Sequence, residues 1–174
     1  MKIYNVVIDE FNKSNLGVPK IEPLIEGVNT LGVDPLTEPL ALTEAVFLSM
    51  LEIPTYSSVA LLLDLRLAIY YADTNWNVGV LICRDILQLQ RNYTYPVSFS
   101  SPKVYQIGDC RVSEMDNHYI LSIDRILSIT CRSLGFFAGN VREIDENDSK
   151  TSSELNRDIL WDRQIDLQAY SYLN

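Results

Sequence analysis

Residues 58–91 constrain the fold of this chain more than any other stretch. They contain two long apolar runs rich in β-branched and aromatic residues, and the polar cluster DTNWN (residues 73–77) separates the two runs. Two such runs around a short polar cluster are typical of a β-hairpin. We therefore predict that this hairpin organises an antiparallel sheet.

Residue parity in both runs predicts how the hairpin pairs. Alternate residues from 61 to 69 are leucine or isoleucine and share one face, while the other face is mixed. In the second run the apolar parity switches near Arg84 and Asp85, which predicts a β-bulge there. The polar cluster places the turn at Thr74 and Asn75.

This register brings charged side chains from both strands close to one another. They fall opposite or diagonal to each other on the mixed face, where opposite charges form cross-strand ion pairs. The set consists of Asp64, Arg66, Arg84 and Asp85. We interpret these residues as structural charge pairs, and the alternative is a small active site on this face.

A helix is predicted before the hairpin, over about residues 38–52. Thr37 is able to cap it, Pro39 suits its first turn and Pro54 ends it. Apolar and small side chains within these limits recur at the helical spacing. They are Leu40, Thr43, Val46, Phe47, Met50 and Leu51. We expect this helix to pack against one side of the sheet.

The remaining segments complete a single predicted domain over residues 1–174. Residues 1–11 have strand composition, and residues 12–39 are an irregular segment punctuated by proline and glycine. Residues 104–115, 118–123 and 126–139 read as a strand meander, with turns at Asp116–Asn117 and Asp124–Arg125. In the acidic segment 142–174, Ser152 or Ser153 caps a short helix.

The predicted fold class is therefore α+β. It comprises an antiparallel, strongly twisted sheet of about six or seven strands, a packed helix and a short C-terminal helix. The predicted parts are residues 1–57 (strand, irregular segment and helix), 58–141 (antiparallel strands) and 142–174 (acidic segment).

Composition restricts the partners and the compartment. The net charge of −9 and the pI of about 4.5 repel nucleic acid and anionic lipid. No apolar run approaches the roughly 20 residues of a membrane helix, and no signal peptide is recognised at the N-terminus. Cys83, Cys110 and Cys131 lie in apolar runs, so we expect buried thiols in a reducing cytoplasm.

The sequence carries no recognisable catalytic or cofactor motif. His118 is the only histidine, so a histidine-rich metal site is excluded. Nucleophile-elbow, phosphate-loop, dinucleotide and zinc-protease motifs are absent. Ten tyrosines and two tryptophans supply residues that suit protein interfaces. We expect a binding protein with no enzymatic activity, no cofactor and no metal.

One set of strings resembles a known class of small bacterial proteins. The strings are LLLDLRLA (61–68), NVGVLICR (77–84), GFFAGNV (135–141) and, after an acidic segment, WD (161–162). Over residues 58–162 this pattern resembles toxin-immunity proteins of contact-dependent inhibition and polymorphic toxin systems. The resemblance implies a cytoplasmic, non-enzymatic inhibitor whose partner is a cognate toxin domain.

Such toxins are often basic nucleases, which an acidic partner attracts electrostatically. We therefore predict that toxin binding uses exposed aromatic and acidic side chains. They are Trp76, Glu143, Asp145, Glu146, Asp148, Glu154, Asp158, Trp161 and Asp162. The alternatives are a ligand-binding module or enzyme on the mixed hairpin face, and an accessory subunit of a bacterial or phage assembly.

Overall fold

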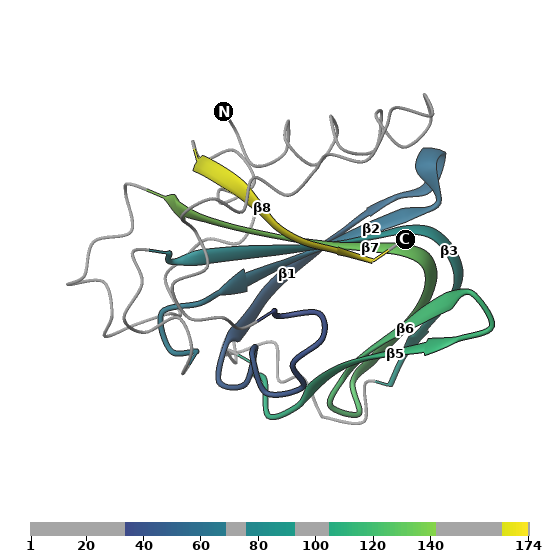
Figure 1. Cartoon of the computed structure of the whole chain (residues 1–174), viewed down its shortest axis with the longest axis horizontal. Coiled ribbons are helices and arrows are strands. Elements are labelled where there is room, and N and C mark those ends of the chain that lie inside the picture. Colours follow the sequence, from purple (N-terminus) through teal and green to yellow (C-terminus); the bar gives the residue numbers. More distant parts are fainter. Residues whose placement is uncertain (1–33, 69–75, 93–104, 142–164, 174) are drawn as a thin grey trace, which may run out of the picture.

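The fold is seen in a computed structural model that describes residues 34–68, 76–92, 105–141 and 165–173. This part is built almost entirely of strands, which form one curled antiparallel sheet in the shape of a half-barrel (Figure 1). The strands are β1 (Val46–Ile53), β2 (Ser58–Asp64), β3 (Val78–Arg91), β4 (Tyr105–Gln106), β5 (Cys110–Met115), β6 (His118–Ile123), β7 (Leu127–Val141) and β8 (Ile165–Leu173). Their order is β4-β1-β2-β3-β7-β6-β5, and β8 also pairs with β7.

The predicted α+β class and its packed helix are wrong. Within the described residues there is no α-helix, only a 3-10 turn at Pro54–Tyr56. Residues 38–45 form successive turns, and β1 occupies the rest of the stretch predicted as helix. Strand β1 pairs with the apolar strand β2, for example Met50 with Leu61. This tertiary pairing overrides the helical spacing, because a short apolar run fits either period.

Three other predicted segments lie partly or wholly outside the described residues. These are the strand at residues 1–11, the irregular segment up to residue 33 and the short helix after residue 152. The end of the acidic segment is described, and it forms strand β8 along the second half of β7.

The predicted central hairpin is confirmed, but its register differs from the one that the sequence predicted. Strands β2 and β3 are antiparallel, and their last pair is Asp64 with Val78. The first strand therefore ends at Asp64, whereas the sequence predicted apolar alternation up to residue 69. The Asp64 carboxylate accepts a hydrogen bond from the Arg66 backbone N–H at 3.0 Å. This local turn competes with the strand ladder and ends the strand early.

Strands β3 and β7 are the longest, and they bend together at a corner. At one end of their ladder Val78 pairs with Gly139, and at the other end Arg91 pairs with Leu127. Cys83 and Ile86 both face the core although they are three positions apart, and on β7 the same holds for Leu134 and Cys131. A regular strand alternates faces at every residue, so both backbones must bend here. Figure 1 shows the two strands curving side by side.

Backbone irregularity marks the corner in β3. Asp85 has a left-handed φ of 51°, and the register shifts between Ile86 and Gln88, where Leu87 is the additional residue. The predicted bulge near Arg84 and Asp85 therefore lies close to the observed irregularity. Asp tolerates this conformation better than most residues because its short side chain bonds locally.

The corner divides the sheet into two halves that differ in burial. In the covered half, made of β1, β2, Val78–Arg84 and Leu134–Gly139, every residue of β2 is buried, so both of its faces are covered. In the open half, made of β5, β6, Asp85–Arg91 and Leu127–Arg132, burial alternates and one face is solvated. The core lies inside the curl and includes Phe136, Leu61 and Leu81.

We predict opposite effects for two glycine substitutions in the same strand. Asp85→Gly should leave the free energy of unfolding unchanged or raise it by up to about 1 kcal/mol, because glycine adopts a positive φ without steric cost. Gln88→Gly, at an exposed extended position, should lower it by about 1 kcal/mol. Urea denaturation measures both, and equal losses would contradict the left-handed corner.

Candidate functional site

The two ends of the curled sheet meet at a seam formed by residues 105–110. Strands β4 and β5 stand at opposite ends of the strand order, yet only residues 107–109 separate them in sequence. Ile107 is fully buried, and its backbone bonds to the turn before β1: its N–H donates to the Ala45 carbonyl and its carbonyl accepts from the Glu44 N–H, both at 2.8 Å. The seam thus joins the first and last strands of the sheet path.

Asp124 clasps the seam from the turn between β6 and β7. Its carboxylate accepts the Tyr105 hydroxyl at 2.7 Å, the Asp109 N–H at 2.8 Å and the Gly108 N–H at 3.1 Å. Its own N–H donates to the Asp109 carbonyl at 2.8 Å. A Cβ on Gly108 would lie 3.1 Å from an Asp124 oxygen, so glycine leaves room for this contact. Hydrogen bonds to a charged acceptor are stronger than neutral ones, so the clasp holds the curl closed.

The seam is suited to structure rather than to acid–base chemistry. Three donors occupy the Asp124 carboxylate, and the Asp109 carboxylate pairs with Arg111 at 2.8 Å. Burial, together with the negative charges of Asp109 and Asp124, raises the pKa of the Cys110 thiol to about 12. Cys110 is therefore a neutral thiol near pH 7, and His118 lies at the other end of the β5–β6 pair from it.

The predicted charge quartet does not converge. Asp64 and Arg66 pair with each other, with Arg66 Nη2 2.6 Å from Asp64 Oδ2. Arg84 lies at the opposite end of the β2–β3 pairing, since Val59 pairs with Cys83, and its guanidinium contacts the Ser133 hydroxyl at 3.3 Å. Asp85 is exposed at the corner. The sequence missed this arrangement because the predicted register placed Asp64 opposite Asp85, whereas Asp64 pairs with Val78.

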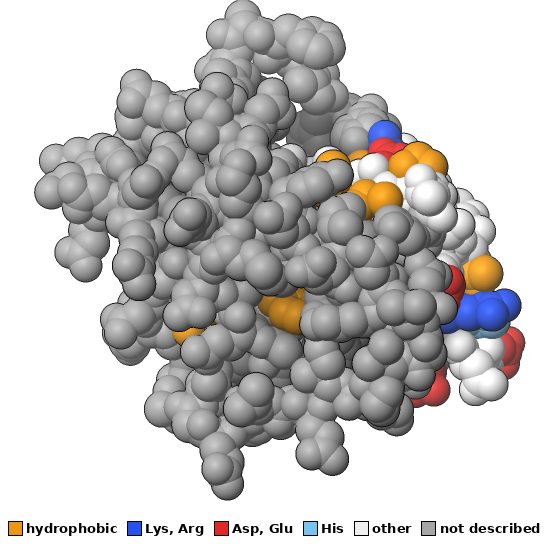
Figure 2. Space-filling view, turned by 90° about the horizontal axis from the view of Figure 1, so that it is seen from above, with side chains coloured by type: hydrophobic (Ala, Val, Ile, Leu, Met, Phe, Trp, Pro, Cys, Tyr) orange, Lys and Arg blue, Asp and Glu red, His pale blue; other side chains and the backbone are white. Residues whose placement is uncertain are grey.

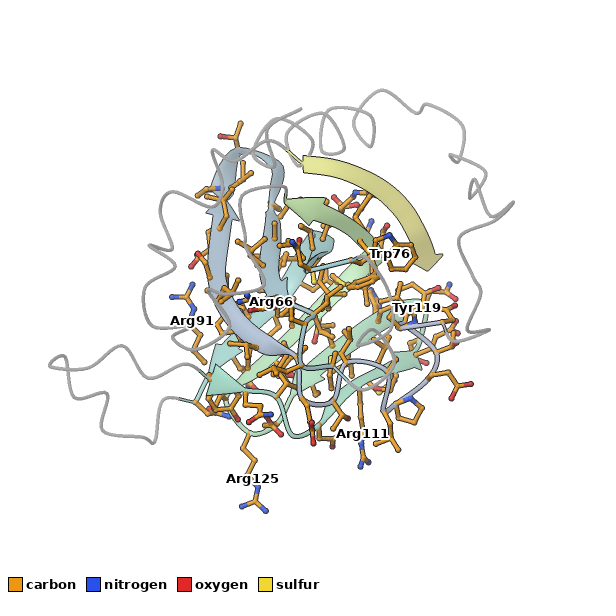
Figure 3. All side chains as sticks on the ribbon, turned by 90° about the vertical axis from the view of Figure 1, so that its left-hand side faces the viewer. Arg66, Trp76, Arg91, Arg111, Tyr119 and Arg125 are labelled. Carbon is orange, nitrogen blue, oxygen red and sulfur yellow. The ribbon has the colours of Figure 1, made fainter. Side chains whose placement is uncertain are left out.

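Of the predicted toxin-binding residues, the structure describes one. Trp76 is half-buried, packs against the core and lies two residues before β3, so it does not project from a hairpin tip (Figure 3). The other eight lie between residues 143 and 162, outside the described residues.

The open half carries an exposed polar surface that sequence reasoning did not single out. Its outer face, on the side away from Tyr119, Leu121 and Ile123, spans β5, β6, β7 and β3. By register it consists of Arg111, Ser113, Met115, His118, Ile120, Ser122, Ser128, Thr130, Arg132, Gln88 and Gln90. Figure 2 shows polar, basic, acidic and histidine side chains together at one edge of the molecule. The alternation of apolar and polar residues over 127–131 was the sequence signal from which this surface could have been predicted.

All three cysteines are free thiols buried in one core, which confirms the predicted burial. Cys83 lies in β3 and Cys131 in β7, while Cys110 begins β5. Residues this far apart in sequence come together only through the sheet topology.

Neither a metal cluster nor a membrane helix occurs in the part of the chain that the structure describes. No group of three or more His, Cys, Asp or Glu side chains there could hold a metal ion. No helix there is long and apolar enough to cross a bilayer. In comparisons with known proteins, no family model, curated protein or solved structure matches the chain.

The clasp predicts a large stability difference between two aspartates in similar turns. Asp124→Ala should lower the free energy of unfolding by about 3 kcal/mol, because three donors lose a charged acceptor. Asp116→Ala is the matched control, since Asp116 also sits in a turn with a positive φ (48°, against 45° at Asp124). Asp116→Ala should lower the free energy of unfolding by no more than about 1 kcal/mol. If urea denaturation gives similar losses for the two variants, the role of Asp124 as a clasp is contradicted.

The raised pKa of Cys110 predicts a pH-dependent contribution to stability. Its folded-state pKa of about 12 exceeds the ordinary 9.0, so the contribution is complete below pH 9 and is lost as the pH rises toward 12. The difference in unfolding free energy between the natural chain and Cys110→Ala should therefore shift against the natural chain by about 1.4 kcal/mol per pH unit in that window. A difference that stays constant from pH 8 to 11 would contradict the prediction.

Proposed function

We propose that this chain is a cytoplasmic, non-enzymatic immunity protein that binds and neutralises a cognate toxin domain, which is a basic nuclease. One observation carries the proposal: residues 143–162 contain seven acidic and two basic residues, in a chain whose net charge is −9. A strongly acidic surface speeds association with a basic partner through electrostatic steering. The resemblance of residues 58–162 to toxin-immunity proteins points to the same class of partner.

The described residues support binding in preference to catalysis. Two buried or half-buried carboxylates already have structural partners, since Asp124 accepts three donors and Asp64 pairs with Arg66. The alternative of an enzyme on the hairpin face needs four converging charged residues, and Arg84 lies at the far end of the pairing from Asp64. The outer face of the open half offers a polar surface of the kind found at the rims of protein interfaces.

Co-expression with the product of a neighbouring toxin gene tests the proposal. We expect the two proteins to co-purify and the chain to protect cells and substrate nucleic acid from the toxin. An accessory subunit of an assembly would give no protection, so the assay separates that alternative. If the chain forms no complex with any neighbouring gene product and protects against none of them, the immunity function is overturned.

We predict that the acidic segment governs the association rate. A variant with Glu143, Asp145, Glu146 and Asp148 changed to the corresponding amides should associate with the toxin about tenfold more slowly at low salt, and the difference should shrink at high salt. The matched control removes the same charge from exposed residues elsewhere. It changes Glu38, Glu44, Glu114 and Asp116 to amides.

Stopped-flow association kinetics measure both variants. Equal slowing in the two would assign the steering to net charge alone and would contradict a binding role for residues 143–148.

A further inference from the structure

Strand β5 has one open edge. It is the last strand in the sheet order and pairs with β6 on one side, and no strand among the described residues lies along its other side (Figure 1). Most residues of β5 are exposed, and Met115 near its end is 59% exposed. The open edge of β5 therefore lies at the surface of the protein, where a further strand could pair with it.

The turn between β5 and β6 shows which backbone groups of β5 are used by the sheet. Asp116 and Asn117 have φ values of 48° and 63°, and two consecutive positive φ values in a two-residue loop are those of a type I′ turn. Such a turn closes on a pair of residues that exchange both backbone hydrogen bonds, and here the pair is Met115 and His118. Hydrogen-bonded pairs alternate along an antiparallel ladder, so every second residue before Met115 also bonds to β6.

The other end of the β5–β6 pair gives the same alternation. The Asp109 carbonyl accepts a hydrogen bond from the Asp124 N–H at 2.8 Å, and Asp109 is an even number of residues from Met115. The residues between these positions direct their backbone groups to the other side. The N–H and C=O groups of Val112 and Glu114 therefore point out of the open edge.

The charges beside the open edge are acidic on balance. Arg111 pairs with Asp109 at 2.8 Å, whereas Glu114 and Asp116 are exposed and neither forms an ion pair in the part of the chain that the structure describes. A second copy of the chain would bring the same carboxylates and a net charge of −9, so electrostatic repulsion disfavours it at this edge. A strand with lysine or arginine opposite Glu114 is attracted instead.

We propose that the open edge of β5 binds an extended basic segment of another protein as an additional antiparallel strand. The N–H and C=O groups of Val112 and Glu114 bond to the backbone of the segment and fix its register. Val112 packs against the core, so the residue opposite it is apolar, and the residue opposite Glu114 is lysine or arginine. This inference does not depend on toxin binding.

A blocked heptapeptide of sequence TKTKTVT is the probe, because its valine and its second lysine can lie opposite Val112 and Glu114. Titration into the isotope-labelled full-length chain should shift the NMR signals of the Val112 and Glu114 amides and slow their hydrogen exchange. The Ser113 amide already bonds to β6, so its exchange should change less. The acidic peptide TETETVT should bind about tenfold more weakly.

Two variants separate strand pairing from general charge attraction. Val112→Pro removes an N–H that the β5–β6 ladder does not use, and it should weaken binding of the basic peptide at least about tenfold. Val112→Thr keeps this N–H and the β-branched shape, so it is the matched control and should bind as the natural chain does. Glu114→Lys, at an exposed position, should reverse the preference between the two peptides.

The natural chain and Glu114→Lys decide the outcome even if Val112→Pro fails to fold. The proposal is overturned if millimolar basic peptide leaves the Val112 and Glu114 amides unchanged, or if the natural chain binds both peptides equally. An unchanged preference in Glu114→Lys, or equal binding by folded Val112→Pro and Val112→Thr, also contradicts it. Slowed exchange of both amides at rising concentration of the chain alone would assign the edge to a second copy and reject the basic segment.

Discussion

Backbone pairing between β3 and β7 is the interaction on which the other strands depend. The two strands pair from Val78–Gly139 to Arg91–Leu127, through the corner. Strand β2 attaches to the first half of β3, while β6 and β8 attach to the first and second halves of β7. The remaining strands connect to the pair only through these three. A ladder continuous through the corner therefore sets the register of the whole sheet.

The bend in this pair explains both the covered core and the seam. Because the sheet turns back on itself, the apolar side chains of β2, β6 and β7 face one another inside the curl, with Phe136 filling the space that Gly79 leaves. A side chain at Gly79 would come within 3.0 Å of the Phe136 ring. The same curl brings the first and last strands together, where Asp124 can bind the backbone of the seam.

Sequence patterns predicted the features that depend on neighbouring residues. The hairpin and the strands of the meander are present, and turns occur at the predicted Asp116–Asn117 and Asp124–Arg125, with positive φ at Asp116, Asn117 and Asp124. The helix over residues 38–52 failed because a short apolar run such as residues 46–51 can form either a helix or a strand, and pairing with β2 decided between them. The shared burial of the cysteines in one core and the Asp124 clasp depend on contacts between distant segments, which local patterns do not contain. The proposal that the acidic residues bind toxin rests on their charge alone.

Interstrand backbone NOEs in solution test the continuous β3–β7 pair most directly. The structure predicts NOEs on both sides of the corner in one sample, for example between Val80 and Phe137 and between Leu89 and Ile129. It also predicts strand contacts between Val46 and Gln106. NOEs confined to the covered half, or helical NOEs running through residues 38–52, would contradict the account.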